Sequence, residues 1–339
     1  MKFFYLMTAI AGFFTAVHGV SAGPATDLPA NEEVNDTTLA VIAWFDKRDT
    51  VTYWIEEANW KVNGKDTVKT TGVSTKVMIT VTDSTRKGYR MEYKFLDFQC
   101  DTLTDPTLDA FQRNVVNLLS DRLTGASIRF RTNEYGHITK YDNLGQIRKR
   151  TKGLCRSVMQ EMMNLPWADS LKSVGIDLEK MLGKSLDDGA LVDGFTEDLE
   201  ELFSNHATSF PIGDFDVHTE ATEDEYESYT NVYIGQDPDS MEYEIVTVVT
   251  TVIPSADLKE LLSGLYDYFQ AGESGMEDLG EEYDRQITED ATVMNFHSWS
   301  YFADGWPQEY ESYSEFKLMD SRKFKQKRII WNRYNVGNH

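Results

Sequence analysis

The chain has 339 residues, and 41% of them are hydrophobic, which is enough for a sizeable core and excludes wholesale disorder. Its 33 Lys and Arg residues against 56 Asp and Glu residues give a net charge of −23, which argues against sequence-independent nucleic-acid binding. Two cysteines exclude a disulfide-dense miniprotein and a four-cysteine zinc site.

Residues 1–22 have the pattern of a secretory signal peptide. Lys2 provides the positive start, Phe3–Val17 is largely apolar, and Val20-Ser21-Ala22 offers small residues for cleavage. An uncleaved anchor is the alternative, but the run is shorter than the roughly 20 apolar residues that a membrane span needs. We therefore predict a secreted or periplasmic protein without a transmembrane segment in the mature chain, and a flexible segment over residues 23–36.

The first half of the chain is rich in alternating apolar and polar residues. Tyr89–Phe95 alternates strictly, as a strand with one wet face does, and Asn63-Gly64 between two such runs predicts a hairpin. Asp105-Pro106 predicts the start of a helix, with Gly125 as its end. We expect a second helix over residues 144–165, stopped by Pro166, and a helix from Asp187-Asp188 to about residue 205.

The second half returns to strand-like patterns. We expect strands over residues 213–219, 226–234, 241–253, 292–302, 309–318 and 323–336, with a helix beginning at Pro254. Strands and helices do not alternate one by one along the chain. The order therefore predicts an α+β fold with largely antiparallel sheet and several amphipathic helices.

An internal echo suggests two halves, residues 37–205 and 206–339. Met91-Glu92-Tyr93 and Met241-Glu242-Tyr243 each lie in a strand, and Pro106 and Pro254 each open the helix that follows. The first unit is then a β-α-β half with a helical insertion, and the second an acidic β-α-β half ending in a basic strand. Duplication and coincidental reuse of a common order both explain the echo.

Acidic residues are concentrated in the second half. Residues 187–290 contain 29 Asp and Glu but only Lys259 and Arg285 as basic residues, whereas the C-terminal strand is basic. A basic protein partner or Ca²⁺ would suit this surface, and a solvated face that maintains solubility is the alternative. The loop over residues 272–290 is the part we expect to be least stable.

Motifs for common chemistries are missing from the sequence. It contains no Gly-x-Ser-x-Gly, no phosphate loop, no dinucleotide fingerprint and no His-Glu-x-x-His. We therefore assign no catalytic residue, metal site or cofactor and favour a non-enzymatic role. The alternative is a hydrolase that cleaves a glycan with two of its own many carboxylates.

Two sets of residues are singled out as candidates for a special role. Cys100 and Cys155 are the only thiols, and an oxidising compartment favours a disulfide between them, with two buried free thiols as the alternative. Four aromatic residues near the C-terminal strands are candidates for binding an apolar or glycan ligand, because such rings offer flat apolar surface with a polar edge: Trp299, Tyr301, Trp306 and Tyr310. Packing in the core explains the same four residues without a ligand.

Two segments carry a resemblance to other proteins. Residues 126–138 (ASIRFRTNEYGHI) and residues 209–214 (SFPIGD) look like segments of uncharacterised secreted bacterial proteins. Some of these resemble LolA/LppX-like or lipocalin-like carriers. The resemblance implies a curved antiparallel sheet covered by helices and, by analogy of fold, a binding or carrier role.

Three functions follow as hypotheses. The first is a secreted or periplasmic non-catalytic binding or carrier protein for an apolar or small ligand. The second is a carboxylate-dependent hydrolase acting on glycan or envelope material. The third is an envelope assembly protein with an acidic docking surface.

Overall fold

The structure is a computed structural model that describes residues 38–63, 65–164, 188–222, 226–259 and 288–332. The predicted signal peptide, the segment 23–36, and all but the last residues of the acidic loop 272–290 lie outside the described residues. Within the described part, no helix is long and apolar enough to span a membrane.

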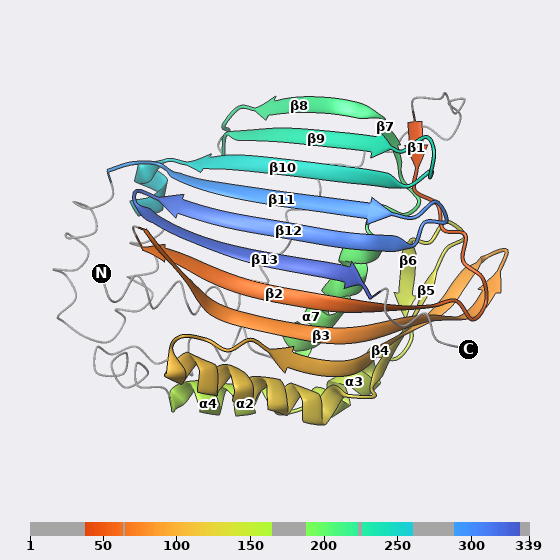
Figure 1. The fold of residues 1–339 in the computed structure, drawn as a ribbon, viewed down its shortest axis with the longest axis horizontal. Coiled ribbons are helices and arrows are strands. Elements are labelled where there is room, and N and C mark those ends of the chain that lie inside the picture. The colour runs from red at the N-terminus through yellow and green to blue at the C-terminus, as the bar shows by residue number, and fades with distance from the viewer. Residues whose placement is uncertain (1–37, 64, 165–187, 223–225, 260–287, 333–339) are drawn as a thin grey trace.

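One sheet of eleven strands dominates the molecule (Figure 1). Each strand pairs antiparallel with its neighbours, so the predicted α+β class with a curved antiparallel sheet is confirmed. In spatial order the strands are β6 (Ile138–Tyr141), β5 (Ser127–Thr132), β4 (Gly88–Cys100), β3 (Asp66–Thr85), β2 (Thr50–Asn63), β13 (Ser321–Trp331), β12 (Pro307–Leu318), β11 (Ala291–Tyr301), β10 (Tyr243–Ile253), β9 (Ser228–Gln236) and β8 (Gly213–Thr219). A short second sheet pairs β1 (Thr38–Ala40) with β7 (Ser209–Pro211).

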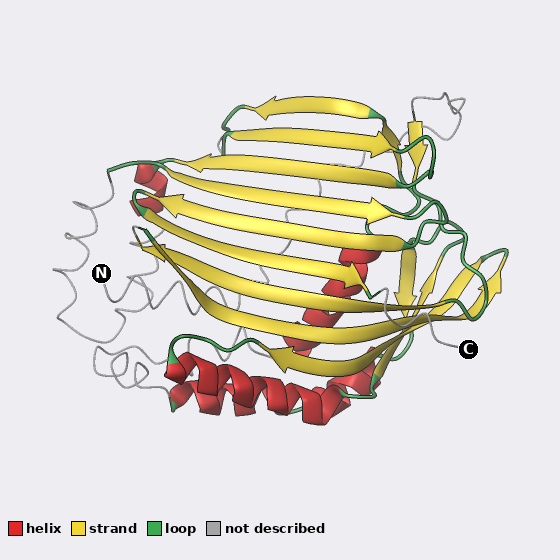
Figure 2. Cartoon of the chain, in the orientation of Figure 1, coloured by secondary structure: helices red, strands yellow, loops and turns green. Residues whose placement is uncertain are grey.

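The helices lie on one face of the sheet and along one of its sides (Figure 2). The first, α2 (Pro106–Leu123), begins as the sequence predicts, because the Asp105 carboxylate accepts hydrogen bonds from the backbone N–H groups of Thr107 and Leu108 at 2.8 and 3.2 Å. Gly125 follows this helix with a φ of +77°, a left-handed conformation that glycine adopts without strain.

The prediction of a single helix over residues 144–165 is wrong in one respect. The structure divides it into α3 (Leu144–Thr151) and α4 (Leu154–Met163). Gly153 separates the two with a φ of +76°, which no residue inside an α-helix has. The sequence did not indicate this break, because the apolar residues keep the same spacing on both sides of it.

The last described long helix, α7 (Asp188–Phe203), starts where the acidic pair at residues 187–188 predicts. It crosses the sheet behind β13 and β2 in the view of Figure 1. We call the face that α7 contacts the inner face. It carries the buried residues Tyr53, Tyr93, Ile245 and Tyr310, and the core lies between it and α7.

The two halves of the chain meet at the middle of the sheet. β2 pairs with β13 from Tyr53 opposite Trp331 to Asn63 opposite Ser321. Strands β2–β6 lie on one side of this junction and strands β8–β13 on the other, so both halves contribute to one continuous sheet. A common origin of the halves stays a prediction.

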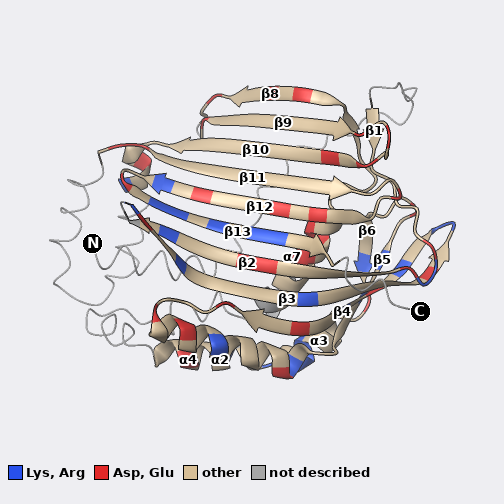
Figure 3. Ribbon diagram, viewed as in Figure 1, with Lys and Arg blue, Asp and Glu red and all other residues tan. Residues whose placement is uncertain are grey.

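The tertiary structure also places the charges. The basic strand β13 lies in the centre of the sheet, and the acidic strands β8 and β10 lie towards one edge (Figure 3). The opposite edge, at β5 and β6, is basic. The basic strand is also paired with an acidic neighbour, since β12 beside it carries Glu309, Glu311 and Glu315.

Candidate functional site

A buried ion cluster fastens α7 to the sheet. Lys327 on β13 is only 5% exposed, and its Nζ lies 2.6 Å from Asp198 Oδ1 and forms a second ion pair with Glu201 Oε2. Both carboxylates come from α7, three residues apart and therefore on one side of the helix. One lysine at the centre of the sheet is thus neutralised by two acids of the covering helix.

Aromatic side chains of three strands complete the cluster. Tyr93 donates a hydrogen bond to Asp198 Oδ2 at 3.2 Å, and Tyr310 donates one to Glu201 Oε1 at 3.2 Å. The indole N–H of Trp299 donates to the backbone carbonyl of Glu201 at 2.8 Å. These bonds satisfy polar groups that would be costly to bury alone.

Burial governs the ionisation of the cluster. It raises the pKa of Glu201 to about 7, even though Lys327 opposes the shift, and it raises the pKa of Asp198 as well. Burial by itself lowers the pKa of Lys327, but the neighbouring Asp198 and Glu201 raise it well above its usual value. The lysine is therefore charged at neutral pH, and Glu201 titrates near neutrality.

The four aromatic residues predicted to bind a ligand are all buried: Trp299, Tyr301, Trp306 and Tyr310 are 6%, 0%, 5% and 1% exposed. Trp299 and Tyr310 contact α7 as described above, and Trp306 stacks on Phe45 with ring centroids 4.0 Å apart. The structure therefore gathers the four residues, and Tyr301 also contributes to the wall of a pocket.

A histidine that the sequence did not single out lies in the same core. His206 is 1% exposed and packs against Phe45, Phe203 and Tyr301. Its Nε2 donates to the backbone carbonyl of Gly305 at 3.0 Å, and burial lowers its pKa to about 4. His206 is therefore neutral at physiological pH and serves the packing of the core.

The pocket that includes Tyr301 has a volume of about 340 Å³. We call it the Tyr243 pocket. It lies where the turn between β9 and β10 meets the end of β11 and the start of β12. Its lining residues combine tyrosines, carboxylates and amides: Tyr233, Gly235, Gln236, Asp237, Glu242, Tyr243, Glu244, Ser300, Tyr301 and Gln308.

Two polar atoms of this pocket are buried without a hydrogen-bond partner among the described residues. They are the hydroxyl of Tyr243, whose side chain is 6% exposed, and Nε2 of Gln308. Gln308 is the extra residue of a β-bulge, since Ser300 is opposite Glu309 while Tyr301 is opposite Pro307. Native proteins leave few such atoms unsatisfied, so both point to a ligand or an ordered water.

The remaining walls add aromatic surface and negative charge. The rings of Tyr243 and Tyr301 stack with centroids 5.0 Å apart and an interplanar angle of 18°. Backbone N–H groups of Asp239 and Ser240 hold the pKa of Asp237 below its usual value, so this carboxylate is an acceptor at neutral pH. Tyr243 belongs to the Met-Glu-Tyr echo of the sequence.

The predicted disulfide stays a prediction. Cys100 has a free thiol in the structure, and the side chain of Cys155 lies outside the described residues. Within the described residues no group of three or more His, Cys, Asp or Glu could hold a metal ion. His218 instead pairs with Glu227 at 3.0 Å and stacks on Tyr229.

Comparison with known proteins assigns the chain to no family. No protein-family model matches the chain, and no curated protein matches it. Among solved structures, the chain is similar to lipovitellin, described in a study of lipid–protein interactions, with 10% identity and a TM-score of 0.39. The likeness covers 85% of this chain and 25% of that one, so the chain spans a quarter of lipovitellin's length.

Proposed function

We propose that this protein is a non-catalytic binding protein for a small, hydroxyl-rich ligand of the sugar or polyol class, held in the Tyr243 pocket. The observation that carries the proposal is the pair of buried polar atoms, Tyr243 Oη and Gln308 Nε2, without partners in the walls of a 340 Å³ pocket. Ligand hydroxyl groups would satisfy both atoms.

The composition of the walls supports this ligand class. Burial raises the pKa of Tyr243 above its usual value, so its hydroxyl keeps its proton and can donate, as the Gln308 amide can. Asp237, Glu242 and Glu244 supply acceptors. Sugar hydroxyls donate and accept together, and tyrosine rings give apolar surface for a sugar face. The pocket volume lies at the lower end of the range for small-molecule sites.

Binding fits the geometry better than glycan hydrolysis does. A glycosidase needs a carboxylic acid of raised pKa beside the scissile bond. Among the described carboxylates, Asp198 and Glu201 have raised pKa values, and both are part of the ion cluster between α7 and the sheet. In the Tyr243 pocket, backbone hydrogen bonds lower the pKa of Asp237 instead.

The apolar version of the carrier hypothesis has less support from the described residues. Between α7 and the inner face, side chains of the core pack against one another, with Phe203, Leu199 and Val192 of the helix all buried. Secretion or a periplasmic location remains part of the proposal and rests on the pattern of residues 1–22.

The test is calorimetric titration of the mature protein with a panel of neutral sugars and polyols, comparing wild type with Tyr243→Phe. Loss of one hydroxyl hydrogen bond should weaken binding about five- to tenfold. Tyr226→Phe is the matched control, since Tyr226 is 40% exposed and lies outside the pocket lining.

Thermal unfolding of the same variants guards against misfolding as an explanation. Without ligand, Tyr243→Phe should be as stable as wild type or more so, because it removes a buried polar atom that has no described partner. Absence of binding to every member of the panel, or equal loss in both variants, would overturn the proposal.

A further inference from the structure

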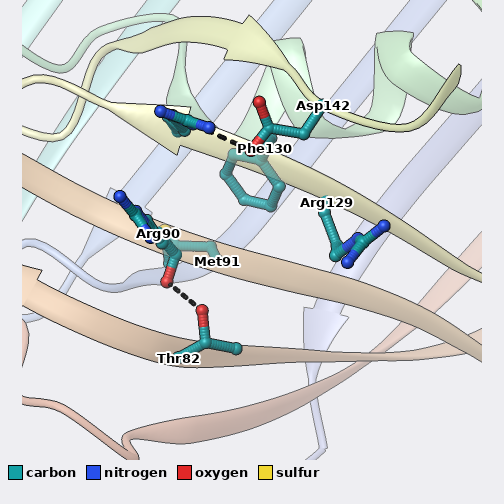
Figure 4. A pocket seen from close by; sticks show the side chains of 7 residues that line it. Thr82, Arg90, Met91, Arg129, Phe130 and Asp142 are labelled. Atoms are coloured by element: carbon teal, nitrogen blue, oxygen red, sulfur yellow. Dashed lines mark hydrogen bonds and ion pairs between the residues drawn. The ribbon is translucent and has the colours of Figure 1, made fainter.

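A second pocket lies at the basic side of the sheet, away from the Tyr243 pocket. It has a volume of about 450 Å³ and is lined by Thr82, Arg90, Met91, Arg129, Phe130, Arg131 and Asp142 (Figure 4). The side chains of Arg90, Arg129 and Arg131 are exposed, whereas Met91 and Phe130 alternate with them and are buried in the core. The arginines therefore occupy the outer face of β4 and β5.

The register of the two strands brings the arginines together. Arg90 on β4 lies directly opposite Arg131 on β5, and Arg129 lies opposite Glu92. Like charges directly opposite one another destabilise a strand pair. An arrangement of this kind is most favourable when an anion lies between the charges.

Only part of this positive charge is neutralised within the protein. Arg131 Nε lies 2.8 Å from Asp142 Oδ2. Among the described residues, the side chains of Arg90 and Arg129 form no hydrogen bond and no ion pair. Glu92 accepts a hydrogen bond from Ser127 at 2.6 Å. The pocket therefore holds three guanidinium groups and one carboxylate in its lining.

We propose that this pocket binds a phosphate group carried by a small molecule or by a lipid headgroup. Guanidinium groups present planar, paired N–H donors that match phosphate oxygens, and they stay charged at any physiological pH. Asp142 holds Arg131 in place and leaves Arg90 and Arg129 to contact the anion. The volume exceeds what a bare phosphate fills, so the pocket has room for the group that bears it.

The charge of the whole molecule favours a compact anion over a polyanion. The chain carries −23, so a nucleic acid or another long anionic polymer is repelled by most of its surface. A single phosphate group engages only the local cluster. The site is on the outer face and shares no lining residue with the Tyr243 pocket, so the two proposals stand or fall separately.

Two titrations of the mature protein test the proposal and distinguish the sources of phosphate. The first follows binding of inorganic phosphate and glycerol 3-phosphate by calorimetry. The second follows sedimentation with vesicles of phosphatidylglycerol in phosphatidylcholine, against vesicles of phosphatidylcholine alone. Both use wild type, Arg90→Gln, Arg129→Gln and the control Arg148→Gln, which removes the same charge from an exposed position on α3 outside the pocket.

We expect Arg90→Gln and Arg129→Gln each to weaken binding about tenfold or more, while Arg148→Gln changes it less than about twofold. Loss confined to the soluble phosphates assigns a free phosphate ester, and loss confined to the vesicles assigns a headgroup. Absence of binding in both titrations, or equal loss in Arg148→Gln, would overturn the proposal. Salt-sensitive self-association that the same variants abolish, without phosphate binding, would assign the arginines to an acidic surface of a second copy instead.

Discussion

Lys327 Nζ lies 2.6 Å from the Asp198 carboxylate, and this contact joins the centre of the sheet to the helix that covers it. Lys327 is on β13, the last described strand of the chain, whereas Asp198 is on α7 of the other predicted half. The pair therefore connects segments that are distant in sequence. Because the pair is buried, removing either partner leaves the other charge without compensation.

Replacing Lys327 with methionine should destabilise the protein by about 3–5 kcal/mol, because it leaves Asp198 and Glu201 buried without their counter-ion. Urea unfolding measures the change. Lys325→Met on the same strand is the control, since its 3.6 Å pair with Glu57 is partly exposed and should contribute no more than about 1 kcal/mol. Equal losses in the two variants would show that burial of the cluster has no energetic consequence.

Glu201 should make stability fall as pH rises. Its pKa is about 7 in the folded protein against 4.5 ordinarily, so the folded state binds more protons between these values. The stabilisation is complete below about pH 4.5 and is lost by about pH 7. A shift of this size corresponds to roughly 3 kcal/mol.

His206 opposes Glu201 over much of the same range. Its pKa of about 4 lies below the ordinary 6.5, so stability from His206 is lost as pH falls from 6.5 to 4. Relative to wild type, Glu201→Gln should therefore gain stability as pH rises from 4.5 to 7, because the variant lacks the contribution of Glu201 and keeps the opposing contribution of His206. Urea unfolding of both proteins from pH 4.5 to 7 measures this, and parallel pH profiles would contradict the assignment of Glu201.

Gly136→Ala should cost more stability than Gly125→Ala. Both glycines have positive φ, +99° and +77°, so alanine costs about 1–2 kcal/mol at either position. A Cβ at Gly136 would also lie 2.5 Å from the ring of the buried His206, whereas nothing lies within 4 Å of one at Gly125. We expect about 1–3 kcal/mol of additional loss at Gly136, measured by thermal or urea unfolding. Equal losses would mean that the His206 ring and Ala43, whose Cβ would lie 2.7 Å from the added one, can both move aside.

Strand β8 should promote association between molecules. It is the last strand at its edge of the sheet, and Phe215 and Val217 on it are 36% and 54% exposed. Unpaired strand edges with apolar side chains template aggregation. Val217→Lys should lower the aggregation rate of concentrated protein, measured by light scattering, and leave the unfolding midpoint nearly unchanged. A Val217→Thr control keeps the β-branched shape without adding charge.

Local signals in the sequence were sufficient to predict most of the helices and strands. The Asp105-Pro106 cap and Gly125 predicted the limits of α2, and strict alternation over Tyr89–Phe95 predicted β4. These features depend on neighbours along the chain, through caps, turns and the period of the apolar residues. The break at Gly153 was missed because the apolar stripe has the same period on both sides of it.

The sites depended on contacts between distant segments. Alternation showed that Arg90 and Arg131 face the solvent, but only the pairing register of β4 and β5 places them opposite each other. The Tyr243 pocket likewise needs the bulge at Gln308 to meet a turn more than sixty residues earlier. Composition and periodicity thus determined an antiparallel α+β protein, while strand register and helix docking, set by the packing of the whole core, determined which polar groups meet.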